Sequence, residues 1–306
     1  MTKISQKDKR LFIFQYGAKA AAKYRNGDCS LYFCPICKLG YDEASAINGE
    51  LTLEDVPPKS IGGKPILLTC HTCNSCAGHT IDSAIANKNE LLNFEKIVTG
   101  QIKGIVPSVK LEVGELQVTT LINTQTTFDI KPVNKANPPK TIENYKKHMV
   151  DISNGGSNCF EFKLSKTLKY NERYAKIGYL KSAFLILFAW LGYRYAFDPR
   201  LNAVRDQIRN PENDIIGTKF WIEDIKENIP SNKIMFSKDP LPMFLIPFHG
   251  CFIILPSLGF KDDVYSSLTN FWGKGDKVNM QAEILDSWPN RLQMKLDYAQ
   301  IGYTSH

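Results

Sequence analysis

Apolar and polar residues alternate along the chain in a way that predicts both helices and short strands. Residues 7–26 have an alanine-rich middle typical of a helix, and residues 74–89 lack proline and also favour one. Further helices are expected at 171–196 and 201–209. Strands are expected at 51–53, 66–69, 109–113, 116–121, 127–130, 160–164, 219–222, 233–236, 243–248 and 251–255. Gly114-Glu115 and His249-Gly250 favour turns, and 134–141 a loop. This mixture predicts an α+β fold.

The most apolar stretch, residues 183–191, raises the question of a membrane span. Lys181 and Arg194 bound it and leave about a dozen apolar positions, whereas a span needs roughly 20. We therefore interpret it as a buried core helix and expect no membrane partner. In the first half of the expected helix 171–196, Arg173, Lys176 and Lys181 alternate with tyrosines, a pattern that can bind phosphates and stack on bases. Lysines on the solvated side of a core helix are the simpler interpretation.

Composition and charge place the chain among globular proteins with more than one domain. It has 306 residues, of which 43% are hydrophobic, enough for a packed core, so extensive disorder is not expected. The net charge of +7 is compatible with a polyanionic partner without requiring one. Basic residues are concentrated in 1–33, which we interpret either as an arm that steers phosphates or as the solvated face of a helix.

The cysteines are unevenly placed, because six of the eight fall between Cys29 and Cys76. The sequence starts with charged residues and no apolar export signal, so we expect a reducing, cytoplasmic location. Two Cys-x-x-Cys pairs in such a chain predict a tetrahedral site for structural Zn²⁺. The expected ligands are Cys34, Cys37, Cys70 and Cys73.

Polar residues that could hold a second metal lie between and after these pairs. Glu54-Asp55 end the first short strand, and Asn74, His79 and Asp82 lie on the following helix. A polar strand end that faces a polar helix face can hold a divalent ion and a water. The alternative interpretation of Glu54-Asp55 is a solvated turn before two prolines.

The order of these residues resembles the HNH (ββα-metal) endonucleases of the zinc-knuckle type. The resemblance covers Cys34 to about Ala84 and includes the acidic strand end, Gly62-Gly63, the Cys-x-x-Cys-Asn sequence and Asp82. It implies a zinc-stabilised ββα-metal module over 34–100, preceded by a basic helical arm over 1–33.

The resemblance also implies a role for each residue. Glu54 and Asp82 would bind catalytic Mg²⁺ or Mn²⁺, which prefer oxygen ligands. Asn74 would orient the loop that carries the base by hydrogen bonding to its backbone. The metal would neutralise charge that develops on the scissile phosphate, and Lys59 and Lys64 would contact the nucleic acid.

One departure bears on activity, because Asp55 stands where the family has its general-base histidine. This departure leaves three interpretations open: Asp55 acts as base or metal ligand, His79 supplies the imidazole, or the module is inactive and only binds nucleic acid. We expect a metal-dependent endonuclease that hydrolyses DNA. The alternative is a catalytically degenerate zinc-knuckle module that binds nucleic acid or a protein partner.

Residues 105–306 contain no recognised catalytic motif, and we expect a mixed α/β domain for recognition or regulation there. A regulatory protein partner is compatible with such a domain. By analogy with other nuclease fusions, a role in phage defence is an expectation that rests on fold type alone.

Overall fold

The computed structural model describes most of the chain and has a mixed α+β fold, which confirms the expected fold class. The described residues are 5–27, 29–99, 101–102, 104–111, 116–124, 127–154, 164–165, 168–223, 231–239, 241–248, 250–258, 264–272 and 281–295. They form two compact units, Met1–Ala86 with Tyr170–His306, and Asn87–Lys169. Each unit is described by itself.

The N-terminal part of the first unit contains two small hairpins and the helices around them. Its elements are α1 (Gln6–Arg25), β1 (Tyr32–Phe33), β2 (Gly40–Tyr41), α2 (Glu43–Asn48), β3 (Leu51–Val56), η1 (Lys59–Ile61), β4 (Lys64–Cys70), α3 (His71–Ala77) and η2 (Gly78–Asp82). The π-helical η2 continues into α4 (Ser83–Val98), which leads out of this unit. The expected first helix and the two expected strands are confirmed, and α2 is an addition to them.

Two contacts fix the hairpins in place. The Tyr32 hydroxyl, fully buried, donates to the Leu68 carbonyl at 2.8 Å and accepts from the Leu68 N–H at 3.1 Å, so β1 is tied to β4. In the turn between β3 and β4, a Cβ on Gly63 would lie 1.4 Å from the Pro57 carbonyl oxygen. Only glycine allows that close approach of two backbone segments.

The C-terminal part of the first unit is a sheet packed on a long helix. The helical elements are α6 (Glu172–Leu191), α7 (Tyr193–Ala196), η4 (Pro199–Leu201), α8 (Asn202–Arg209) and α9 (Val264–Trp272). The five strands are β9 (Trp221–Glu223), β10 (Lys233–Asp239), β11 (Met243–Phe248), β12 (Cys251–Pro256) and β13 (Gln281–Ser287). They pair antiparallel in the order β13-β10-β11-β12-β9. The expected helix over 171–196 is interrupted at Gly192, whose φ is +86°.

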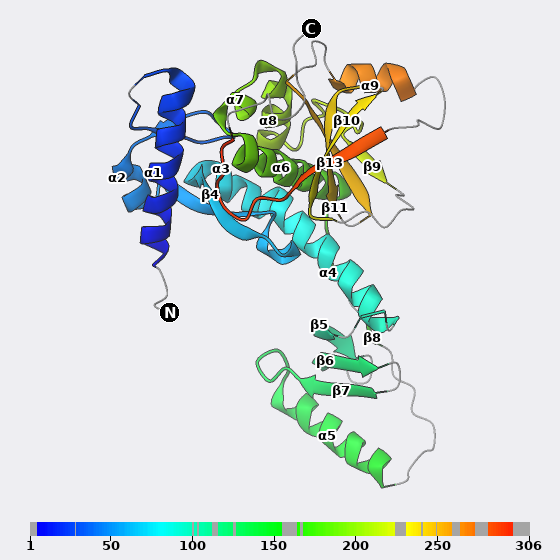
Figure 1. Cartoon of the computed structure of the whole chain (residues 1–306). Helices are drawn as coiled ribbons and strands as arrows, with labels where there is room; N and C mark the ends of the chain where they lie inside the picture. The colour runs from blue at the N-terminus through cyan, green and yellow to red at the C-terminus, as the bar shows by residue number, and fades with distance from the viewer. Residues whose placement is uncertain are drawn as a thin grey trace. The chain divides into compact units, whose positions relative to one another are not determined.

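Helix α6 forms the centre of the first unit, packed against β12 on the sheet and against η2 and β3 of the N-terminal part (Figure 1). Among the described helices it is long and apolar enough to cross a membrane, but 89% of that window is buried inside the molecule. A single helix of this kind is weak evidence for a span. Its burial confirms the interpretation as a core helix, but Lys181 is 1% exposed, so the interpretation that this lysine lies on the solvated side of the helix is wrong.

The described residues of the second unit form the greater part of α4, from Asn87 on, an antiparallel sheet in the order β7-β6-β5-β8, and helix α5. Its elements are β5 (Gly104–Leu111), β6 (Leu116–Thr124), β7 (Thr127–Pro132), α5 (Pro139–Ser153) and β8 (Leu164–Ser165). The expected loop at 134–141 therefore ends in the first turn of α5. The predicted turn Gly114-Glu115, residue His249 and most of the predicted strand at 160–164 lie outside the described residues.

The boundaries inferred from the sequence, 1–33, 34–100 and 105–306, differ from these two units. Contacts join the segment before residue 87 to the segment after residue 169, while the residues between them form the second unit. The Asn87 side chain donates to the Lys169 carbonyl at 3.0 Å, so the two ends of the inserted unit lie side by side.

Candidate functional site

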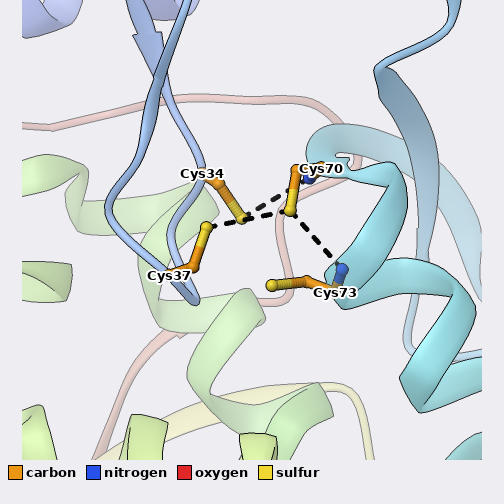
Figure 2. A group of neighbouring side chains, drawn as sticks. All are labelled: Cys34, Cys37, Cys70 and Cys73. Carbon is orange, nitrogen blue, oxygen red and sulfur yellow. Dashed lines mark hydrogen bonds between the residues drawn. The ribbon is translucent and has the colours of Figure 1, made fainter.

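Four cysteine thiols from two hairpins converge on one point (Figure 2). Cys34 and Cys37 follow β1, whereas Cys70 ends β4 and Cys73 lies in the first turn of α3. All four sulfur atoms lie within 4.8 Å of one another. The sulfurs of Cys37 and Cys70 are 3.7 Å apart, and the Cys70 N–H points at the Cys34 sulfur at 3.4 Å.

This arrangement fits zinc. Ligands about 2.3 Å from a tetrahedral zinc lie roughly 3.8 Å from each other, close to the sulfur spacing in the cluster. Cys70 is the N-cap of α3, whose first turn stabilises negative charge on sulfur. Hydrogen bonds from the other three thiols lower the pKa of Cys70. The four expected ligands therefore form a site that could hold a zinc ion, with a structural role for the metal.

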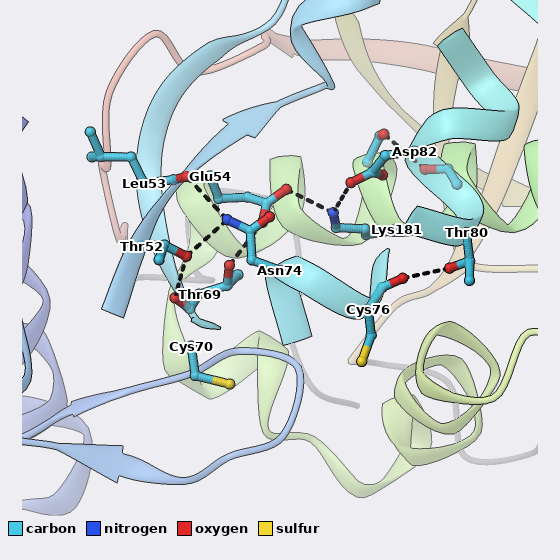
Figure 3. Close-up of polar contacts among 12 residues, drawn as sticks. Thr52, Leu53, Glu54, Thr69, Cys70, Asn74, Cys76, Thr80, Asp82 and Lys181 are labelled. Carbon is cyan, nitrogen blue, oxygen red and sulfur yellow. Dashed lines mark hydrogen bonds and ion pairs between the residues drawn. The ribbon is translucent and has the colours of Figure 1, made fainter. Parts of the chain in front are cut away.

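Glu54 and Asp82, the expected ligands of a catalytic metal, both bind the ammonium group of Lys181 (Figure 3). The Lys181 Nζ lies 2.8 Å from Glu54 Oε1 and 2.7 Å from Asp82 Oδ2. The second oxygen of Glu54 accepts from the Thr69 hydroxyl at 2.8 Å. The side chains of Lys181, Glu54 and Asp82 are 1%, 3% and 17% exposed, so this charged group lies in the core.

The close packing of α6 on η2 brings Lys181 to this position. Gly178 precedes Lys181 by about one helical turn, and a Cβ on it would lie 2.7 Å from the Ile81 carbonyl oxygen and 2.6 Å from Ile85 Cδ1. Without that Cβ, the helices approach closely enough for the lysine to reach Asp82. The packing of α6 therefore determines which group lies between the two carboxylates.

The electrostatics favour a charged lysine at this position. Burial by itself would lower the pKa of Lys181, but the carboxylates of Glu54 and Asp82 outweigh it and raise the pKa. Burial raises the pKa of Glu54, and Asp82 adds to that effect. A divalent ion bound by Glu54 and Asp82 would have to displace the ammonium. The residues as arranged fit an internal cation there rather than Mg²⁺ or Mn²⁺.

The Asn74 side chain contacts the backbone of β3, whereas the resemblance implies a contact to the loop that carries the base. Its side-chain amide donates to the Leu53 carbonyl at 3.3 Å and to the Thr52 hydroxyl at 2.8 Å (Figure 3). Both partners lie on β3, directly before Glu54. Asn74 thus ties α3, which carries Cys73 of the cluster, to the strand that carries Glu54 and Asp55.

Asp55 does not share the environment of Glu54. The pairing of β3 with β4 shifts register between these two residues, and such bulges redirect side chains. Asp55 lines a polar cavity of about 460 Å³, together with Gln6 and Arg10 of α1 and Lys59 of η1. Burial raises the pKa of Asp55, and nearby Lys59 and Lys9 reduce that rise.

His79 lies away from the acidic residues. It is exposed and lines a different cavity of about 620 Å³, beside the cysteine cluster, with Cys76, Tyr174 and Arg209. Neither Glu54, Asp55 nor Asp82 lines that cavity. Because η2 is π-helical, with i→i+5 hydrogen bonds, the three-residue step from His79 to Asp82 does not have the α-helical rotation that the sequence argument assumed.

The remaining predicted residues, Lys59 and Lys64, are exposed at the β3–β4 turn, where only Lys59 lines the Asp55 cavity. The role of Lys181 was not predicted from the sequence. The available signal was its position next to an apolar run, which suggests burial, and a lysine is almost never fully buried unless it is paired with an acidic group.

Comparison with known proteins adds no family to this geometry: no family model, curated protein or solved structure matches the chain.

Proposed function

We propose that this chain binds DNA as a zinc-stabilised module of the HNH type, with the β3–β4 turn and the start of α1 as the contact surface. The observation that supports the proposal is the cavity at Asp55. Arg10 comes from α1 and Lys59 from η1, two segments far apart in sequence, and both line it. Lys9 lies close enough to influence the pKa of Asp55.

Basic side chains gathered from separate elements suit a phosphodiester backbone. Lys and Arg neutralise phosphates and release counterions, which supplies most of the sequence-independent affinity for DNA. Lys64 is exposed directly after the turn and extends the basic surface. The Nε of Arg10 donates to the Ala46 carbonyl at 2.9 Å, so this side chain is held in place before a ligand arrives.

The second candidate is the endonuclease implied by the resemblance. Two observations favour it: Asn74 holds the backbone of β3, and Asp55, at the general-base position, has a raised pKa in an accessible cavity. A higher pKa makes a carboxylate a better base near neutral pH. This candidate requires a divalent ion in the place of the Lys181 ammonium.

The regulatory partner and the cytoplasmic location stay predictions.

Binding is tested with a labelled DNA duplex by fluorescence anisotropy on the zinc-loaded full chain. The Lys59→Glu/Lys64→Glu variant should bind at least about tenfold more weakly, and the slope of log K against log salt should fall by about 0.9 per lost phosphate contact. Lys238→Glu is the matched control, because Lys238 is 64% exposed on β10, away from the cavity. Equal losses in both variants would contradict the assignment of the surface.

Hydrolysis is tested with plasmid DNA and Mg²⁺ or Mn²⁺, comparing the wild-type chain with Asp55→Ala and Asp82→Ala. Binding without cleavage supports the first candidate. Divalent-dependent cleavage that both substitutions abolish supports the second. A wild-type chain that neither binds nor cleaves DNA would rule out both candidate functions.

A further inference from the structure

The cation between Glu54 and Asp82 comes from a part of the chain far from the zinc-binding segment. Lys181 is separated from Asp82 by 99 residues, and α6 belongs to the C-terminal part of the first unit. The lysine approaches both carboxylates at hydrogen-bonding distance, 2.8 and 2.7 Å, and it is the best buried of the three side chains. It therefore occupies the position that two converging carboxylates would offer to a metal.

We infer that Lys181 replaces the divalent cation of this ββα arrangement, so that the wild-type chain does not bind Mg²⁺ or Mn²⁺ through Glu54 and Asp82. The inference goes beyond DNA binding and does not depend on it. It rests on the position, the burial and the two ion pairs of Lys181.

The charge balance explains why an internal cation is stable there. Two carboxylates in a low-dielectric interior need a positive partner, and one ammonium with a hydrogen bond to each supplies it. The Thr69 hydroxyl satisfies the other oxygen of Glu54. Asp82 Oδ1 is buried and has no hydrogen-bond partner among the described residues. The group carries one net negative charge when all three side chains are ionised.

Displacement of the lysine by a metal is strongly opposed. The ammonium would have to leave both carboxylates, and α6 is held against η2 by the contact at Gly178. Removing one partner from a buried ion pair lowers the equilibrium constant for the arrangement that contains it by a factor on the order of 100 or more. Mg²⁺ also requires a nearly regular octahedron of oxygen ligands. Together with the cost of displacing the ammonium, this requirement keeps Mg²⁺ from occupying the site between Glu54 and Asp82 at ordinary concentrations.

Removal of the ammonium should then open a metal site. In Lys181→Ala the oxygens that faced the nitrogen, together with Asp82 Oδ1, become available to a divalent ion and its waters. We expect Lys181→Ala to bind one Mn²⁺ per chain at least about 100-fold more tightly than the wild-type chain does. The added substitution Asp82→Asn should abolish that gain. Lys176→Met, on the same helix but paired with Glu223 at 3.0 Å, should leave Mn²⁺ binding unchanged.

The measurement is Mn²⁺ binding followed by electron paramagnetic resonance on full-length, zinc-loaded protein without DNA. Wild-type binding of Mn²⁺ that Asp82→Asn removes would overturn the inference, as would a folded Lys181→Ala chain with no gain. If Lys181→Ala does not fold, Mn²⁺ binding is measured on Lys181→Met instead, and the wild-type chain is compared with Asp82→Asn. Because DNA is left out, the result is separate from the fate of the proposed function.

Discussion

Replacing Lys181 with methionine tests the role of the buried charge group in stability. Methionine keeps most of the length of the side chain and its helix propensity but removes the ammonium. The substitution leaves Glu54 and Asp82 buried without a cation, at 3% and 17% exposed. We expect a large loss of stability, because two like charges then face each other in a low-dielectric site.

The magnitude follows from the burial of the group. Breaking a buried ion pair by removing one partner costs about 3–5 kcal/mol, compared with a total free energy of unfolding of about 5–15 kcal/mol for most proteins. The sign of the stability change that a second substitution causes gives a sharper test. In the wild-type chain Glu54→Gln removes a partner of Lys181 and should destabilise. In the Lys181→Met background the same change removes an uncompensated charge and should be neutral or stabilising.

The assay is urea denaturation of zinc-loaded protein, followed by circular dichroism, for the four members of this double-mutant cycle. Lys176→Met serves as the control, since its partner Glu223 is 55% exposed and surface ion pairs contribute about 0–1 kcal/mol. A loss of less than about 1 kcal/mol in the free energy of unfolding of Lys181→Met would contradict a stabilising role for the buried ammonium. So would an effect of Glu54→Gln on the free energy of unfolding that has the same sign and size in both backgrounds.

Three further predictions concern the metal, the turn and the cavity. Metal analysis should find one zinc per chain, and Cys34→Ser should lose it and melt at lower temperature, whereas Cys76→Ser, an exposed thiol outside the cluster, should not. Gly63→Ala should destabilise by about 1–3 kcal/mol or more in urea denaturation because of the 1.4 Å approach, while Gly78→Ala, with open space around it, should stabilise by about 0.4–1 kcal/mol. DNA affinity, by anisotropy, should fall as pH rises through the raised pKa of Asp55, because the ionised carboxylate repels phosphate; Asp55→Asn should remove that part of the pH dependence.

The convergence of the four cysteines was predictable from sequence because its constraints are local. The two Cys-x-x-Cys pairs and the strands between them form a short stretch in which spacing determines geometry. The structure brings the four thiols together as expected. The contact of Asn74 is similarly local, since its hydrogen bond to Leu53 spans 21 residues within the same hairpin and helix.

The environments of Glu54, Asp55 and His79 were not predictable in the same way. A register shift in β3 and a π-helical turn at η2 separate Asp55 and His79 from the Glu54–Asp82 pair, and neither irregularity has a spacing signal in the sequence. The two units of the structure likewise have no signal in the sequence. Hydrophobic patterning does not indicate that the segment after residue 169 packs back onto the segment before residue 87.

Lys181 shows how a remote element can determine the chemistry of a local motif. The motif determines the donors: four thiols that could hold a zinc ion lie together between the hairpins, Asn74 contacts β3, and the carboxylates of Glu54 and Asp82 converge. Buried carboxylates require a cation, but the motif does not specify which one. Here α6 supplies it, because Gly178 lets the helix approach and Lys181 follows about one turn later. In a chain with the same motif and an apolar residue at that position, the two carboxylates would lack their internal cation and would be available to a metal ion.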